Sequence, residues 1–193
     1  MSSHRLSSAR LVDAALEIID EAGVEALTMK RLAGHLGVST MAAYKHVRDK
    51  EALLVLAADE LVGRQLRSSR HSIEWENEVR RHVRRSLQLQ ARHPWASDAL
   101  LRAYRARTTD TPNVAAARDQ LERTLVDAGF GVTETRLARS LVQTVITGLT
   151  VTASYRARGL WAAARGEPSE RAHEEVATAA LLSALRALRA RSA

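Results

Sequence analysis

Apolar residues recur at helical spacing along nearly the whole chain, and this pattern predicts where its elements begin and end. The first stripe follows the i, i+4, i+7, i+8 spacing of an amphipathic helix: Leu11, Ala15, Ile18, Ile19 and Ala22. Ser7 or Ser8 can cap this helix through its hydroxyl oxygen, and Gly23 can end it. We therefore expect a first helix over residues 7–22.

Two short helices are predicted in the segment that follows, residues 28–46. Thr28 can cap the first of them and Ser39 the second. Between them the sequence LGVS places Gly37 where a left-handed turn residue is needed. Two helices joined by a tight glycine turn are typical of a helix-turn-helix, although an ordinary helical hairpin fits the spacing equally well.

The rest of the chain is also helical in its pattern. Asp49 can cap a long helix, and proline or glycine breaks separate the helices that follow it. Their expected ranges are about 50–66, 73–92, 95–106, 114–128, 134–158 and 170–190. The polar stretch RSSRHS, residues 67–72, is the expected domain boundary. We thus predict an all-α chain of about nine helices, with domains at 1–66 and 67–193.

Composition agrees with a helical chain and excludes several classes of protein. Three prolines, nine glycines and few aromatic residues favour helices over sheets. The absence of cysteine excludes disulfides and thiolate chemistry. The first residues lack the apolar core of a secretory signal, and no stretch approaches the length of a membrane span. We expect a soluble cytoplasmic protein without a membrane partner.

The formal net charge of the chain is +7, most of it after residue 50, but one short segment near the N-terminus holds cations with almost no anions. Residues 28–50 contain five cations against one anion, and these cations include every lysine of the chain: Lys30, Arg31, Lys45, Arg48 and Lys50. Lys30, Arg31 and Lys50 fall in the first turns of expected helices, where the helix dipole disfavours a cation. Helix N-termini together with lysine suit phosphate groups. The segment therefore indicates a nucleic-acid partner.

The start of the third expected helix consists of small or hydrogen-bonding residues that can approach base edges in a major groove: Ser39, Thr40, Met41 and Ala42. Directly behind them Tyr44, Lys45 and His46 add side-chain donors, and Lys50 follows at the next helix start. We interpret the small residues as base readers and the donors behind them as contacts to the DNA backbone.

Residues 27–54, LTMKRLAGHLGVSTMAAYKHVRDKEALL, resemble the DNA-binding domain of tetracycline-repressor (TetR) family regulators. The marks are Thr28 at a helix start, LA..LGVS, Tyr44, HV and KEALL, in the family's order and spacing. The resemblance implies phosphate contacts from Thr28, Tyr44, His46 and Lys50. It implies base contacts from Thr40, Met41, Ala42 and Lys45, beside Ser39. Ala43 stands where the family usually has a larger core residue, so the packing there is either looser or filled from the first helix.

The remainder resembles the family's ligand-binding and dimerisation half, through RHPW, TPN and LVDAGF at residues 92–95, 111–113 and 125–130. The resemblance implies that the last two long helices form a four-helix bundle with a second subunit. Their broad apolar faces provide the expected interface residues: Leu141, Val145, Gly148, Leu149, Ala177, Leu181, Ala184 and Leu188. The alternative is that these helices only build the core of a monomer.

A ligand pocket is expected among the middle helices, where apolar bulk combines with a few polar groups. The candidates are Trp75, Trp95, Tyr104, Phe130, Gln143, Thr144, Thr147 and Tyr155, each of which could equally serve ordinary packing. His71, His82 and His93 recur at intervals of about 16 Å along a helix, too far apart to share a metal ion. No metal site or cofactor is expected.

These patterns lead to one main functional hypothesis and one alternative. The main hypothesis is a ligand-responsive transcriptional repressor, a homodimer that binds a palindromic operator in double-stranded DNA and is released by a small-molecule effector. The alternative is a DNA-binding architectural factor or activator on the same scaffold, without an inducer. No glycine-rich phosphate loop, HExxH motif or GxSxG serine occurs, so an enzyme is not expected.

Overall fold

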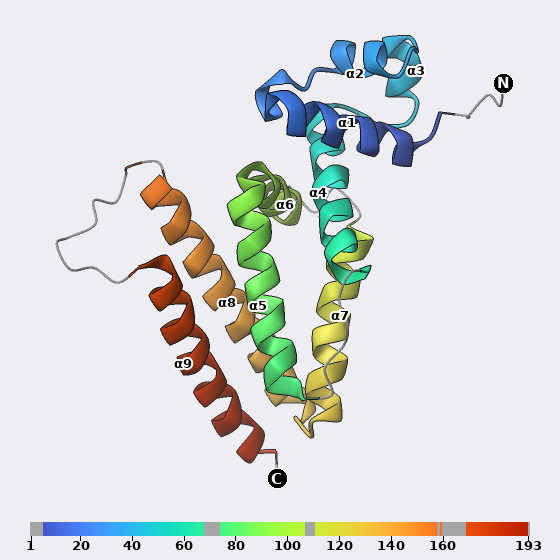
Figure 1. Cartoon of the computed structure of the whole chain (residues 1–193). Coiled ribbons are helices and arrows are strands. Elements are labelled where there is room, and N and C mark those ends of the chain that lie inside the picture. Colours follow the sequence, from blue (N-terminus) through green and yellow to red (C-terminus); the bar gives the residue numbers. More distant parts are fainter. Residues whose placement is uncertain (1–5, 68–73, 107–110, 158, 160–168, 193) are drawn as a thin grey trace. The chain divides into compact units, whose positions relative to one another are not determined.

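The computed structural model describes residues 6–67, 74–106, 111–157, 159 and 169–192 (Figure 1). Within these ranges the regular elements are helical, which confirms the predicted all-α class. They are α1 (Ser8–Ala22), the short 3₁₀ helix η1 (Val24–Ala26), α2 (Met29–His35), α3 (Thr40–Tyr44), α4 (Lys50–Arg67), α5 (Trp75–Arg92), α6 (Pro94–Ala106), α7 (Pro112–Asp127), α8 (Val132–Ala157) and α9 (Glu170–Ala190). Each α-helix ends within about two residues of its predicted bounds.

The chain divides into two compact units that are not continuous in sequence. The first comprises residues 1–67 and 95–114, and the second comprises residues 68–94 and 115–193. Helix α6 and the first residues of α7 thus pack with the N-terminal helices, which no pattern in the sequence indicated. The expected boundary after residue 66 marks the end of α4 closely, and residues 68–72 of the predicted joint lie outside the described residues.

The first unit is built around α1 and α4. Helix α1 packs on α4, α2 and η1, and α2 packs on α3. Its core contains four residues of the predicted stripe of α1, namely Leu11, Ala15, Ile18 and Ile19, whereas Ala22 is exposed. Leu32 of α2, Ala43 of α3 and Leu53 of α4 pack in the same core. Three small residues of α6, Ala96, Ala99 and Ala103, complete this core. The helix-turn-helix is therefore fixed to a continuous apolar cluster rather than attached as a loose hairpin.

The second unit is built from α5, α8, α9 and most of α7. Helices α8 and α9 lie side by side and run in opposite directions, and α5 packs on both of them (Figure 1). Their shared core is apolar: Trp75, Val79, Val83, Leu121, Leu125, Phe130, Ala138, Val142, Ile146, Leu181, Leu182 and Leu185. Among the described helices, none combines the length and the apolar character that crossing a membrane requires.

Candidate nucleic-acid interface

Side-chain caps set the positions of the helices that carry the candidate interface. The Thr28 hydroxyl accepts a hydrogen bond from the Arg31 amide at 3.0 Å, which begins α2. The Asp49 carboxylate accepts from the Ala52 amide at 2.8 Å and from Arg48 Nε at 2.7 Å. The hydrogen bond from the Ala52 amide, and after it the hydrogen bond from Arg48, hold the pKa of Asp49 below its ordinary value. Both predicted caps therefore form, and Asp49 stays ionised at the start of α4.

A glycine turn joins α2 to α3 and orients the third helix. Gly37 has a φ of +66°, the left-handed conformation that glycine adopts readily. The Val38 amide donates to the Ala33 carbonyl at 2.9 Å, the long bond of a Schellman motif. The Ser39 hydroxyl then accepts from the Ala42 amide at 3.2 Å and begins α3. The predicted cap-turn-cap arrangement is present in each of its parts.

The predicted DNA-contacting residues differ in their exposure. The exposed ones are Thr28, Ser39, Met41, Tyr44, Lys45 and His46, and the half-buried ones are Thr40, Ala42 and Lys50. Met41 at the front of α3 is 73% exposed and Tyr44 at its end is 44% exposed, so both are accessible to a partner. The cations Lys30 and Arg31 lie exposed on α2. The exposed side chains of this face thus combine cations with hydrogen-bond donors.

Ala43 is the buried residue of α3 and is fully enclosed, and Val47, just after the helix, is also buried. Both belong to the same apolar cluster as Leu11 and Ala15 of α1. In addition, the Ser8 hydroxyl donates to a main-chain carbonyl, that of His46, at 3.4 Å. The small residue at position 43 is thus accommodated in a core to which α1 contributes, which agrees with the second of the two expectations for this position.

The predicted dimer residues of α8 and α9 fall into two groups. Leu181 lies in the core of its own unit, and Leu141, Val145, Leu149 and Leu188 pack against that core. Gly148 and Ala184 are exposed and Ala177 is half-buried. Further large apolar side chains of these two helices are exposed: Leu137, Val151, Tyr155 and Val176. Both helices therefore keep an apolar surface beyond the one that they bury within the chain.

The eight predicted pocket residues are not brought together. Trp75 and Phe130 meet edge to face in the core of the second unit, with ring centroids 5.3 Å apart. Three residues of α8, Gln143, Thr144 and Thr147, are exposed, as is Tyr155. Trp95 and Tyr104 belong to the other compact unit, where Tyr104 is 83% exposed. The pocket assignment therefore stays a prediction.

Instead, a set of polar side chains lies in the interior of the second unit. Glu78 is buried and binds Arg81 at 2.7 Å and Gln120 Nε2 at 2.8 Å. Gln90 of α5 is 7% exposed and its Nε2 donates to Ser154 Oγ of α8 at 2.9 Å, while its Oε1 has no hydrogen-bond partner within the described residues. Such buried groups are costly unless something satisfies them.

His82 adds to this polar set. It lies one turn after Glu78 on α5, where burial lowers the pKa of its imidazole to about 4 and the Arg85 guanidinium adds to the effect. His82 is therefore neutral near pH 7. His71, which shares its spacing with His82 and His93, lies outside the described residues. No group of three metal-ligating side chains occurs among the residues that are described.

Sequence reasoning named only His82 of this polar set and missed the other members. It also missed Asp59 of α4, which is buried with two hydrogen-bonded partners from the start of α7. A signal for Asp59 was available, because it stands inside the apolar run LLVLAADELV, where an acidic residue on the inward face must find donors.

Comparison with known proteins agrees with the geometry of the N-terminal helices. Residues 11–57 match the family model of bacterial regulatory proteins of the tetR family. The chain is 32% identical over 139 residues to the transcriptional repressor DrrR1 of Streptomyces coeruleorubidus, which is 69% of this chain and 47% of the relative. It is 42% identical over 60 residues to the class D tetracycline repressor of Escherichia coli, which is 31% of this chain and 28% of that repressor. The chain thus spans less than half the length of either relative.

Solved structures of low sequence identity share the fold over nearly the whole chain. A TetR regulator from Streptomyces coelicolor has a TM-score of 0.76 at 22% identity, covering 96% of this chain and all of that one. ActR of the same organism, solved with (S)-DNPA, has a TM-score of 0.72 at 18% identity, covering 98% of this chain and all of ActR. BioQ, solved with its natural double-stranded DNA operator, has a TM-score of 0.66 at 23% identity, covering 92% of this chain and 98% of BioQ.

The caps, the glycine turn and the exposed face of α3 lie within the segment that matches the family model, and the all-α fold is shared with solved members. The chain belongs to the TetR family of transcriptional regulators.

Proposed function

We propose that this protein is a ligand-responsive transcriptional repressor, which binds a palindromic operator as a homodimer and leaves it when a small-molecule effector binds. The observation that carries the proposal is the capped α2–Gly37–α3 unit with its exposed Met41, Tyr44, Lys45 and His46. As a regulator it acts on DNA in the cytoplasm and turns over no substrate.

The two kinds of DNA contact divide between the start and the end of α3. Base edges are read by the residues at its start and by one cation behind them: Ser39, Thr40, Met41, Ala42 and Lys45. Phosphates are held by residues at helix starts and at the end of α3: Thr28, Tyr44, His46 and Lys50. Exposure of Met41, Tyr44, Lys45 and His46 supports this division, since each can reach a partner without rearrangement of the core.

A homodimer explains how one short helix can recognise a specific site. Two copies of α3 separated by about 34–36 Å would read two half-sites one helical turn apart. The spare apolar surface of α8 and α9, with Gly148, Val151, Val176 and Ala184 exposed, supports pairing of these helices with a second copy.

The effector is proposed to bind in the second unit. The buried polar set around Gln90 and Ser154 supports this, because the carbonyl oxygen of Gln90 can accept from a hydroxyl or amide of a ligand. ActR, solved with (S)-DNPA, and BioQ, solved with its operator, share the fold of this chain, which supports a small molecule and DNA as its partners. Differential affinity of the effector for the two conformations would release the DNA.

The test is a footprint of the purified protein on the DNA that flanks its own gene, at two salt concentrations, followed by selection from random DNA if that region is unprotected. We expect a protected palindrome whose protection falls steeply with salt. Failure of the folded protein to enrich any sequence would contradict the proposal. A reporter gene on the protected promoter separates the alternatives. Deletion of a repressor raises reporter expression, and deletion of an activator lowers it. An architectural factor without an inducer would give no response to effectors even in cells that contain the protein.

A further inference from the structure

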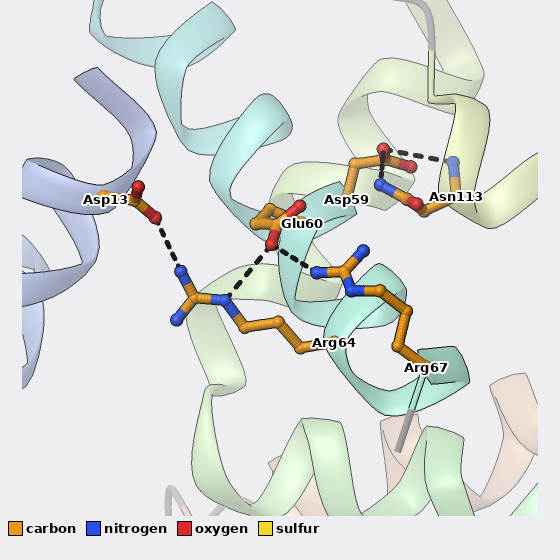
Figure 2. A network of polar contacts seen from close by, with 6 residues as sticks. All are labelled: Asp13, Asp59, Glu60, Arg64, Arg67 and Asn113. Atoms are coloured by element: carbon orange, nitrogen blue, oxygen red, sulfur yellow. Dashed lines mark hydrogen bonds and ion pairs between the residues drawn. The ribbon is translucent and has the colours of Figure 1, made fainter. Parts of the chain in front are cut away.

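The buried carboxylate of Asp59 holds the first turn of another helix. Its Oδ2 accepts from Asn113 Nδ2 at 2.8 Å and from the Asn113 amide at 3.2 Å (Figure 2). Its Oδ1 accepts from the Val114 amide at 2.9 Å. Asn113 and Val114 lie in the first turn of α7, whose amides have no acceptor within their own helix. Asp59 therefore caps α7 from α4, with its negative charge at the positive end of the helix dipole.

Gly63, one turn after Asp59 on α4, leaves the space that Asn113 of α7 occupies. A Cβ added to this buried glycine would lie 2.6 Å from both Cγ and Oδ1 of Asn113. Because Gly63 lies inside a helix, where glycine is a poor residue, its use there has a packing reason. Two independent features of α4, a buried carboxylate and a missing side chain, thus converge on Asn113. We call Asp59, Gly63 and Asn113 the α4 clasp.

Neighbouring charges on α4 pair with α1 and with one another. Arg64 joins Asp13 of α1 at 2.7 Å and Glu60 at 3.2 Å, and Arg67 joins Glu60 at 2.7 Å (Figure 2). These pairs are largely exposed, so each contributes little. They nevertheless provide a control, because Glu60 is the acidic residue next to Asp59, is partly exposed, and pairs with Arg64 and Arg67 of its own helix.

The clasp lies in the second half of α4, the helix that begins directly after the helix-turn-helix. The first half of α4 contributes Leu53 and Leu54 to the core of the DNA-binding helices. The second half holds Asn113 through Asp59 and Gly63. Helix α7 continues from Val114 into residues 115–127, which belong to the second compact unit. These residues include Gln120, which donates a hydrogen bond to the buried Glu78.

We propose that the α4 clasp positions α4 for operator binding, so that Asp59 and Gly63 are positioning residues for DNA recognition and the closed clasp belongs to the operator-bound conformation. This inference rests on the proposed function and deepens it, because an effector in the second unit can then act by opening the clasp. Coupling of two equilibria is reciprocal, so operator DNA must stabilise the clasp by as much as the clasp strengthens operator binding.

The first experiment measures operator affinity of the full chain, using the site found in the footprint. Asp59→Asn removes the charge and one acceptor, and we expect it to weaken operator binding by at least about fivefold, the lower end of the range for coupled sites. Glu60→Gln should change the affinity by less than about twofold. Folding of each variant is checked by thermal unfolding. A folded Asp59→Asn protein with wild-type or higher affinity would overturn the inference.

A second pair of variants decides the question if Asp59→Asn does not fold. Gly63→Ala keeps every hydrogen-bonding group and should weaken operator binding, because its methyl group collides with Asn113. In an Asn113→Ala background the colliding atoms of Asn113 are gone. The other close atom, Arg67 Nη1 at 2.9 Å from the added Cβ, ends a flexible side chain that can move away, so the same substitution should then have little effect. Equal effects of Gly63→Ala in both backgrounds would contradict the clasp.

Amide hydrogen exchange is a readout that would not respond to operator DNA if Asp59 had only a structural role. Exchange of the Asn113 and Val114 amides should slow when operator DNA is added, in proportion to the affinity lost in Asp59→Asn. Unchanged exchange upon operator binding would refute the clasp and leave the proposed function intact. Absence of any DNA binding by the wild-type protein would instead refute the proposed function, and the role of the clasp with it.

Discussion

The ammonium nitrogen of Lys50 lies 3.3 Å from the carbonyl oxygen of Val24, to which it donates a hydrogen bond. Val24 begins η1, just before α2, and Lys50 begins α4, so the bond joins the two ends of the helix-turn-helix. It offsets the unfavourable placement of a cation at a helix start. An ammonium group carries three donors, which leaves donors of Lys50 for a phosphate.

Lys50→Ala is expected to weaken DNA binding about equally for all sequences and to lower the salt slope by about one per subunit, because one phosphate contact is lost. The measurement is the dependence of operator affinity on salt concentration. Arg123→Ala, at an exposed cation of α7, is the control and should leave the slope unchanged. A variant with a wild-type slope would show that Lys50 contacts no phosphate.

Thr40→Ala and Lys45→Ala are expected to change which sequence is preferred, since both residues are proposed to face bases. Each lost base contact should reduce discrimination at one position by about 1–3 kcal/mol. Selection from a random DNA library measures this preference directly. Lys30→Ala on α2 is the comparison, with weaker binding and an unchanged preference. If all three variants lose affinity equally for every DNA sequence, the proposed division between base contacts and phosphate contacts is wrong.

Ala184→Glu is expected to convert a dimer into a monomer, because it places a charge on the open apolar surface of α9. Sedimentation measures the change in mass, and operator affinity should fall with it. Ala116→Glu, at an exposed position of α7, is the control and should leave the protein dimeric. An Ala184→Glu protein that sediments as a dimer would place the interface elsewhere.

The stability of the protein should fall as the pH is lowered from about 6.5 to about 4 because of His82. Burial lowers the pKa of His82 from 6.5 to about 4, Arg85 adds to the effect, and Glu78 opposes it. Between these values the unfolded chain binds a proton that the folded chain does not, so the free energy of unfolding decreases. Urea unfolding across this range measures the slope.

His82→Gln should flatten this part of the stability profile, because its side chain does not titrate. His35→Gln is the matched control, since His35 is exposed and pairs with Glu17 at 2.8 Å. A His82→Gln profile as steep as that of the wild type would show that other groups produce the pH dependence.

Gln90→Leu is expected to leave the melting temperature unchanged or to raise it, because it removes a buried polar atom that has no partner within the described residues. The side-chain oxygen and nitrogen of Gln90 could exchange places, but only one of the two would then bond to Ser154, and the other would still lack that partner. Val83→Ala, at a fully buried position of the same helix, should instead cost about 2 kcal/mol. A large loss of stability in Gln90→Leu would make this amide a structural element rather than a ligand site.

The helix ends and the turn that orients α3 could be predicted from the sequence, because the interactions that form them join residues close together in the chain. Thr28, Ser39 and Asp49 bond to amides three residues away, and Gly37 adopts its left-handed conformation within a single turn. The aromatic residues show the opposite case. Trp75 and Phe130 lie in a core while Tyr104 is exposed, although all three were equal candidates for a pocket. Which face of a helix is buried depends on its neighbours, and periodicity does not identify the neighbours.

By itself, the sequence determined the helix ends, the all-α class and the helix-turn-helix, since these depend on interactions within about one turn of helix. Only the tertiary structure decided that α6 joins the N-terminal unit, that Gln90 meets Ser154, and that Asp59 and Gly63 of α4 hold Asn113. These contacts join residues as many as 64 positions apart. They arise because buried polar groups must find partners and close-packed helices must find space, conditions that exist only once the chain has folded.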